Sequence, residues 1–123
     1  MYSAAGPDNP AVASLKAAVA LSGVSQEVVD ERVGTGLGRI LDAILTESGL
    51  KRAVISGGDT SGRAASTLGI DALTAVAPLA PGSPLCRAHA ARPDRDGLEI
   101  ALKGGQVGAR DFFVQAVLVA QKK

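Results

Sequence analysis

A strand that turns through paired glycines into a helix is the feature that most constrains this chain. Residues 53–62 read Ala-Val-Ile-Ser-Gly-Gly-Asp-Thr-Ser-Gly, and a helix is expected to begin at Asp59, Thr60 or Ser61. The first turn of a helix leaves backbone N–H groups without intrahelical partners, and the helix dipole is positive there. Such a turn suits an anion, most often a phosphate. Residues 57–62 therefore predict a phosphate-bearing ligand.

Composition bounds the class of protein. The chain has 123 residues, of which 46% are hydrophobic, and this is enough for one domain with a packed core. The chain has 13 basic and 12 acidic residues, so its net charge gives no indication of nucleic-acid binding. The lone Cys86 excludes an internal disulfide and fits a reducing compartment. No signal peptide and no apolar run of membrane-spanning length is visible, so we expect a cytoplasmic location and no membrane partner.

The order of the expected elements favours an α/β fold in which helices flank a sheet. Asn9 and Ser25 are predicted to cap the first two helices, and Gly49 is predicted to end the second. Lys122 and Lys123 would suit the C-terminal end of the last helix. The expected helices span residues 10–22, 26–48, 61–68 and 111–119, and the expected strands span residues 53–56, 72–77, 85–88 and 98–102.

The second helix carries glycines where a helix should not need them. Gly34, Gly36 and Gly38 each cost about 1 kcal/mol relative to alanine in a helix interior. Close packing against a neighbouring element would explain them. The residues expected on the buried face of this helix are Val29, Val33, Leu37, Ile40, Leu41, Ile44 and Leu45.

A second glycine-rich turn strengthens the ligand hypothesis. Residues 103–108 read Lys-Gly-Gly-Gln-Val-Gly and also follow an expected strand. In an open α/β sheet, ligands collect at the carboxyl ends of strands, so both turns could close on one ligand. Thr60 and Ser61 would add hydroxyl donors, and Lys103 would add a positive charge. The alternative for Lys103 is a solvated lysine at the end of a strand.

Two better-known nucleotide motifs do not fit. Residues 57–62 have the glycine spacing of a P-loop, but Arg63 and Ala64 stand where Lys and Ser/Thr are required. Residues 34–38 resemble a dinucleotide fingerprint, but the third glycine comes one residue early and no strand precedes it. His89 has no cysteine, carboxylate or second histidine at ligand spacing, so no metal site is expected there.

Other polar side chains have plain structural interpretations. Asp59 either holds magnesium or caps the helix, and capping alone would explain it. His89 is interpreted as a surface residue and Cys86 as a small buried one. Asp94 and Asp96 are interpreted as solubilising charges in the polar loop at residues 92–97.

Five segments then match a known pattern in order and spacing. They are residues 56–62, 68–70, 80–85, 102–108 and 111–113, with residues 2–8 resembling the end of an internal strand and its loop. Together they resemble the C-terminal, nucleotide-binding domain of the four-carbon acid sugar kinase family. A Gly-Gly-Asp-Thr-Ser-Gly loop paired with a Lys-x-Gly-x-x-Gly loop is a specific combination, although either loop alone is a weak signal.

The resemblance implies ATP- and Mg²⁺-dependent phosphorylation of four-carbon sugar acids such as threonate, erythronate or their 3-oxo forms. Gly104 replaces the commoner serine of the second loop, and Gln106-Val107 replaces the frequent Asn-Phe. The nucleotide contacts that the resemblance implies are Gly57, Gly58, Asp59, Thr60, Ser61 and Gly105, with Lys103, Gly104 and Gly108 as secondary candidates.

The resemblance also implies that residues 1–123 form one nucleotide-binding domain of a two-domain kinase, without the N-terminal domain that binds the sugar acid. Because no catalytic base is visible, the chain alone is expected to be inactive. One alternative is a non-catalytic protein-interaction or effector-like domain. A further expectation is that exposed core surface is covered in a homodimer.

Overall fold

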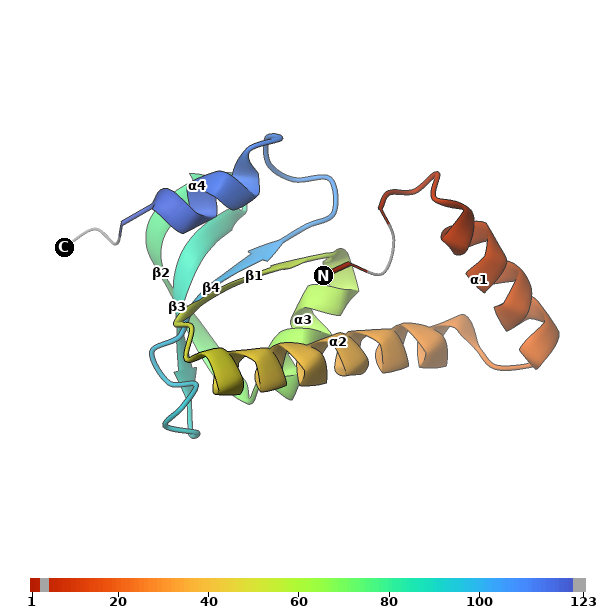
Figure 1. The fold of residues 1–123 in the computed structure, drawn as a ribbon, viewed down its shortest axis with the longest axis horizontal. Coiled ribbons are helices and arrows are strands. Elements are labelled where there is room, and N and C mark those ends of the chain that lie inside the picture. Colours follow the sequence, from red (N-terminus) through yellow and green to blue (C-terminus); the bar gives the residue numbers. More distant parts are fainter. Residues whose placement is uncertain (3–4, 121–123) are drawn as a thin grey trace.

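The computed structural model describes residues 1–2 and 5–120, which form a four-stranded sheet between helices (Figure 1). Helix α4 covers one face of the sheet, and α3 packs against the other face with α2 outside it. The predicted α/β fold is confirmed. The elements are α1 (Pro10–Ser22), α2 (Gln26–Ser48), β1 (Arg52–Ser56), α3 (Gly58–Thr67), β2 (Ile70–Ala80), β3 (Ser83–Ala90), β4 (Glu99–Lys103) and α4 (Phe112–Leu118).

The sheet has the strand order β1-β4-β3-β2. Strand β1 runs parallel to β4, whereas β3 is antiparallel to both β4 and β2. In the β1–β4 register, Ser56 lies opposite Lys103. The carboxyl ends of β1 and β4 therefore meet at the same edge of the sheet, which is where both glycine-rich turns begin.

Local capping explains the limits of the first two helices. The Asn9 side chain accepts a hydrogen bond from the Ala11 N–H, and the Ser25 side chain accepts one from the Val28 N–H. Gly49 adopts the left-handed conformation, with φ of 69°, and its N–H donates to the Leu45 carbonyl. The predicted bounds of α1 and α2 are confirmed because these signals act within one turn of the chain.

The glycines of α2 allow it to approach α3 closely. A Cβ atom at Gly38 would lie 2.7 Å from the Thr67 Cβ, and one at Gly34 would lie 2.9 Å from the Arg63 Cβ. Close packing, expected as the reason for these glycines, is confirmed at both positions. A Cβ at Gly36 would meet nothing within 4 Å, so nothing in the structure explains that glycine.

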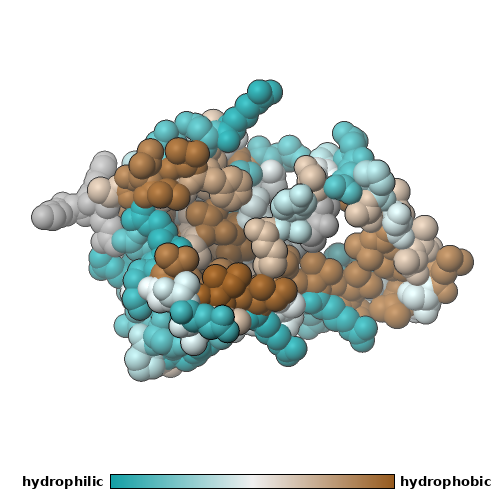
Figure 2. Space-filling view, viewed as in Figure 1, coloured by the Kyte–Doolittle hydropathy of each residue, from teal (hydrophilic) through white to brown (hydrophobic). Residues whose placement is uncertain are grey.

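The expected buried face of α2 is only partly correct. Leu45 is buried, but Ile40 and Ile44 are 46% and 43% exposed. The reason is that α3 has 10 residues and α2 has 23, so α3 covers only a stripe along the longer helix. Figure 2 shows the hydrophobic surface that results along α2 toward α1, with another patch over α4.

The hairpin of β2 and β3 is longer than expected. Residues 78–80, which lie beyond the strand expected at residues 72–77, continue β2, and β3 begins at Ser83. Strand β2 is an edge strand, where a proline such as Pro78 removes no ladder hydrogen bond that the sheet needs. The buried Ser83 hydroxyl donates to the Leu102 carbonyl at 2.7 Å, which ties the start of β3 to β4.

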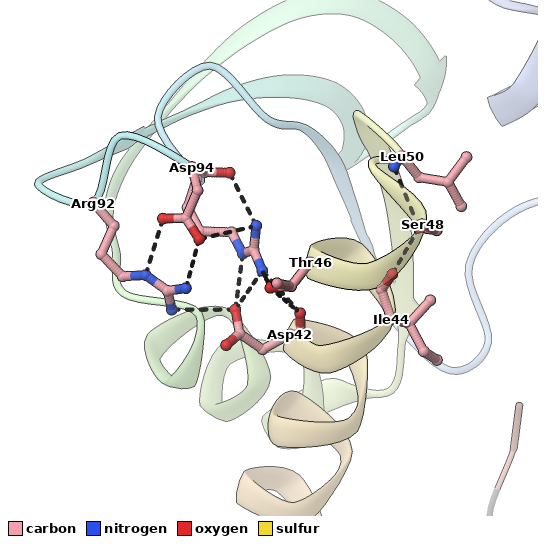
Figure 3. A network of polar contacts seen from close by, with 8 residues as sticks. Asp42, Ile44, Thr46, Ser48, Leu50, Arg92 and Asp94 are labelled. Atoms are coloured by element: carbon pink, nitrogen blue, oxygen red, sulfur yellow. Dashed lines mark hydrogen bonds and ion pairs between the residues drawn. The ribbon is translucent and has the colours of Figure 1, made fainter.

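The polar loop after β3 is fixed to α2 by ion pairs (Figure 3). Arg95 is only 3% exposed, and its guanidinium donates to the Asp42 carboxylate and the Thr46 hydroxyl at 2.8 and 2.7 Å. Asp94 pairs with Arg92 at 2.8 Å, and the hydrogen bond from that guanidinium lowers the pKa of the Asp94 carboxyl.

The interpretation of the two aspartates in this loop as solubilising charges is incomplete, because these exposed residues also form polar contacts within the protein. Asp94 is exposed but paired, and the Asp96 carboxylate accepts a hydrogen bond from the Ala90 N–H at 3.1 Å. The chain reverses direction in this loop between β3 and β4, and both carboxylates help to hold the loop in place.

The N-terminal segment does not form the strand end expected there. Met1 and Tyr2 belong to no strand, because no described strand pairs with them, and residues 5–8 form bends and a turn. The expected strand end at residues 2–8 is thus absent from the described part, with Ser3 and Ala4 outside it. Lys122 and Lys123 also lie outside the described residues. Within residues 1–2 and 5–120, no helix is long and apolar enough to span a membrane.

Candidate functional site

The two glycine-rich loops lie side by side. We define the first loop as residues 57–62 and the second loop as residues 103–108. The Gly57 N–H, directly after β1, donates to the Lys103 carbonyl at the end of β4 over 2.8 Å. This hydrogen bond continues the parallel ladder by one residue beyond Ser56. The expectation that both turns share one edge of the sheet is confirmed.

The first loop leaves the start of α3 without a cap. Gly57 is the N-cap residue, with φ of 134° and ψ of 148°, and no side chain forms a cap hydrogen bond there. Helix α3 begins at Gly58, earlier than the sequence indicated. The N–H groups of its first turn are therefore open donors at the positive end of the helix dipole, as an anion site requires.

Gly58 and Gly105 have free space where a side chain would stand. A Cβ atom at either residue would meet nothing within 4 Å, and neither residue has a positive φ. The protein's own packing therefore does not demand glycine at these two positions. Close approach of a ligand to the backbone would demand it.

Thr60 and Ser61 differ in their surroundings. Ser61 is 8% exposed, and its hydroxyl donates to the Gly58 carbonyl at 2.8 Å. This bond stabilises the first turn of α3. Thr60 is half-buried against Gly57, where a Cβ would lie 3.2 Å from the Thr60 Cβ. Ligand contacts of both residues stay predictions.

Asp59 does not cap the helix. It lies inside the first turn of α3, one residue after the helix begins, and it is exposed. The capping interpretation is wrong because the cap position falls on Gly57, which has no side chain. A carboxylate here still interacts favourably with the helix dipole. It is the one acidic residue of the two loops.

Lys103 is buried beneath the second loop. Its side chain is only 9% exposed, and its ammonium donates to the carbonyls of Gly104 and Gly105, each at 3.1 Å. The ammonium also lies 5.9 Å from the centre of the Phe112 ring. Among the described residues no carboxylate forms an ion pair with it. The alternative of a solvated lysine is wrong, since the second loop folds over the side chain.

Gly108 has a structural reason to be glycine. Its φ is 90°, and a Cβ there would lie 2.7 Å from the Phe112 ring. This position lets Phe112 pack under the end of the second loop, where its ring meets Phe113 edge-on at 5.9 Å. Gly104 is less constrained, with the Val107 side chain 3.1 Å from its hypothetical Cβ.

A groove of about 660 Å³ opens beside the first loop, between α2 and α3. Gly58 and Asp59 of the expected site line this groove, but the other polar residues that line it were not predicted from the sequence. The four-residue spacing of Gly34 and Gly38 places both on one face of α2, and it could have indicated that this face packs closely against another helix. The groove is lined by Glu31, Thr35, Gly58, Asp59, Gly62, Arg63, Ser66 and Thr67.

A second cavity of about 600 Å³ lies against α4 and the first half of β1, away from the loops. There Arg52 pairs with Glu99 and donates to the Ala116 and Val119 carbonyls at 2.9 and 2.7 Å. These bonds satisfy the carbonyls at the end of α4. The arrangement ties the end of α4 to β1, and no residue that lines this cavity belongs to the two loops.

A family model described as the nucleotide-binding C-terminal domain matches residues 1–113. The chain belongs to this family. Similar proteins include the 3-oxo-isoapionate kinase of Paraburkholderia graminis, 48% identical over 92% of this chain and 24% of that enzyme. The 3-oxo-tetronate kinase of Pseudomonas savastanoi pv. phaseolicola is 39% identical over 76% of this chain and 22% of that enzyme. The crystal structure of Haemophilus influenzae protein HI1011 superposes with a TM-score of 0.63, at 28% identity over 86% of this chain and 24% of that one.

Membership confirms the resemblance to the C-terminal domain of four-carbon acid sugar kinases. The full-length relatives are named kinases, as expected. This nucleotide-binding domain spans about a quarter of the length of those relatives.

Two remaining side chains of the nucleotide-binding domain lie away from the loops. Cys86 is buried in β3, where burial raises the pKa of its thiol, and its interpretation as a small buried residue is confirmed. His89 is exposed, as expected, and its ring lies 2.8 Å from the Thr74 hydroxyl. Among the described residues, no three His, Cys, Asp or Glu side chains gather as a metal site.

Proposed function

We propose that this domain binds ATP with its two loops, as the nucleotide-binding part of a kinase for four-carbon acid sugars. The acceptors would be threonate, erythronate or 3-oxo-tetronates. The observation that carries the proposal is the 2.8 Å hydrogen bond from Gly57 to Lys103, because it sets both loops at one edge of the sheet. The names of the relatives support the class of reaction and of acceptor.

The backbone of the first loop would hold the phosphates. The open N–H groups of residues 58–60 are donors for phosphate oxygens, and Gly57 gives the turn a positive-φ conformation that residues with side chains rarely adopt. The Ser61 hydroxyl keeps that first turn closed through Gly58. The open space over Gly58 lets a phosphate reach the backbone.

The second loop would close on the nucleotide from the other side. Gly105 is exposed with open space above it, whereas Gly104 and Gly108 shape the turn around it. The Lys103 ammonium lies under the loop and adds positive potential near the polyphosphate. These contacts bind and orient the nucleotide, which is the larger part of catalysis in phosphoryl transfer.

Magnesium is part of the proposal. Mg²⁺ in kinases is held by substrate phosphates, water and one or two carboxylates, and when bound it neutralises charge on the phosphates. Asp59 fits this role because it is the acidic residue of the two loops and has no capping bond of its own. No other residue of the loops supplies an anionic ligand.

The activity of a whole kinase requires more than this domain supplies. The chain spans about a quarter of the relatives' length, so we place acceptor binding largely on the remainder of such an enzyme. We propose that residues 1–123 act as one domain in the cytoplasm, where the unpaired Cys86 stays reduced. A homodimer stays a prediction.

Isothermal titration calorimetry with MgADP tests the nucleotide assignment. We expect binding that weakens when Mg²⁺ is omitted, since the polyphosphate charge is then less neutralised. Adenosine, which lacks phosphate, should not bind measurably. Equal affinity for adenosine and MgADP would contradict a phosphate-centred site, and no heat with MgADP would contradict the proposal itself.

A further inference from the structure

Helix α4 supports the second loop, which runs from the end of β4 toward α4 (Figure 1). Phe112, the first residue of the helix, is buried, and its ring lies against both ends of that loop. At the start of the loop, the Lys103 ammonium lies 5.9 Å from the centre of the ring. At its end, a Cβ on Gly108 would lie only 2.7 Å from the ring. The position of α4 therefore sets the position of the loop that carries Gly105.

Apolar packing alone holds α4 weakly. The helix has seven residues, fewer than the roughly 12 that an isolated helix needs, so it depends on contacts with the rest of the protein. Its buried side chains are Phe112 and Ala116, and the second of these is only a methyl group. Val117 and Leu118, at the other end, are 74% and 70% exposed. The C-terminal end of α4 is therefore held mainly by polar contacts.

Arg52 of β1 supplies these polar contacts. Its Nη1 donates to the carbonyls of Ala116, Val117 and Val119, at 2.9, 3.1 and 2.7 Å. The last carbonyls of a helix have no partner within it and form the negative end of its dipole, so a guanidinium suits them on both counts. The other side of the same guanidinium pairs with Glu99 of β4, which orients it toward the helix.

The Arg52–Glu99 pair lies away from the nucleotide site. These two residues are opposite each other at the start of the β1–β4 ladder, and Ser56 lies opposite Lys103 at its end. Four residues of strand separate the pair from the loops, or about 13 Å. Because Arg52 points to the end of α4, any effect that it has on a nucleotide between the loops is indirect.

We propose that Arg52 is a positioning residue for nucleotide binding. It holds the C-terminal end of α4 on the sheet, so that Phe112 keeps the second loop where Gly105 closes on the nucleotide. This inference rests on the proposed function, because it needs a nucleotide between the two loops. Loss of Arg52 should weaken nucleotide binding by way of the second loop and leave the first loop in place.

Arg52→Met in the 123-residue chain tests the proposal, since it keeps much of the apolar stem and removes every donor. We expect the Kd for MgADP in calorimetry to rise about three- to thirtyfold, the range that coupling through intervening residues gives. In ¹H–¹⁵N spectra of the free protein, the amides of Gly105 and Gly108 should shift, whereas those of Gly58 and Thr60 should not. Arg52→Lys still donates to carbonyls of α4 and should recover part of both effects.

Arg92→Met is the matched control. Arg92 also forms two ion pairs, with Asp42 and Asp94, but it lies in the loop that contacts α2. Its loss should affect thermal unfolding without changing the Kd or the amides of the second loop. Should Arg52→Met lose its dispersed spectrum, Arg52→Lys carries the test. One ammonium cannot replace the Glu99 pair and all three carbonyl bonds, so a smaller shift of the second loop is still expected, and a wild-type spectrum and Kd would then refute the proposal.

The results separate the positioning role from the nucleotide assignment. If the wild type binds MgADP and folded Arg52→Met binds it equally well, only the positioning role is refuted, even where the amides of the second loop shift. Weaker binding with shifts at Gly58 and Thr60, and none in the second loop, would refute the route through α4. If the wild type binds no MgADP, the proposed function fails, and the positioning role fails with it.

Discussion

Gly58→Val should remove nucleotide binding while leaving the fold intact. A Cβ at this position meets no atom within 4 Å, and the residue has no positive φ, so a side chain that branches there starts in open space and adds no backbone strain. Valine is also no worse than glycine in a helix. We therefore expect a change in unfolding free energy within about 0.5 kcal/mol, as for a surface substitution.

The expected loss lies in binding. A β-branched side chain over the first turn of α3 would hold a phosphate away from the open N–H groups. Each lost charge-assisted hydrogen bond costs about 1.5–3 kcal/mol, which is roughly tenfold to more than a hundredfold in Kd. Calorimetry with MgADP measures this directly. Gly105→Val should give a similar result from the second loop, for the same steric reason.

Gly36→Val is the matched control. It too places a Cβ in open space on a helix, but on α2 and outside both loops. Its affinity for MgADP should equal that of the wild type. Wild-type affinity in both Gly58→Val and Gly105→Val, with normal thermal unfolding, would refute the assignment of the phosphates to these loops.

Three further predictions concern stability and the second loop. Gly38→Ala should destabilise the chain by about 1–3 kcal/mol in urea unfolding, because its Cβ would overlap α3; a stability like that of Gly36→Ala would contradict this packing. Ionised Asp94, whose pKa the Arg92 hydrogen bond lowers, stabilises the fold above its usual pKa of 3.8 and loses this effect as pH falls through the lower folded value. Asp94→Asn should therefore weaken the fall of the unfolding free energy at acid pH. An unchanged pH dependence would show that the Asp94–Arg92 pair contributes nothing to stability. Lys103→Met keeps the apolar stem but leaves two loop carbonyls without their donor, so MgADP affinity should fall several-fold in calorimetry; unchanged affinity would assign the lysine a purely structural role.

Features that depend on neighbouring residues could be predicted from the sequence. Asn9, Ser25 and Gly49 set the limits of α1 and α2 through bonds that span one turn, and these limits were correct. The meeting of the two loops could be predicted as well. It follows from a general rule on where loops after parallel strands lie, and the Gly57–Lys103 hydrogen bond bears it out.

Features that depend on distant packing could not be predicted. Lys103 is buried because the second loop folds back over it and Phe112 packs beneath, which no local pattern indicates. The ion pairs of Arg95 require that α2 pass beside the loop after β3. The groove around Arg63 lies between α2 and α3, which Gly34 and Gly38 allow to pack closely.

The central claim is that both loops contact the same nucleotide, and an amide-resolved MgADP titration tests it most directly. The account predicts that the amides of Gly58, Thr60 and Gly105 shift together, with one common Kd, while the amide of Gly36 does not move. Shifts confined to one loop, or different midpoints for the two loops, would contradict it.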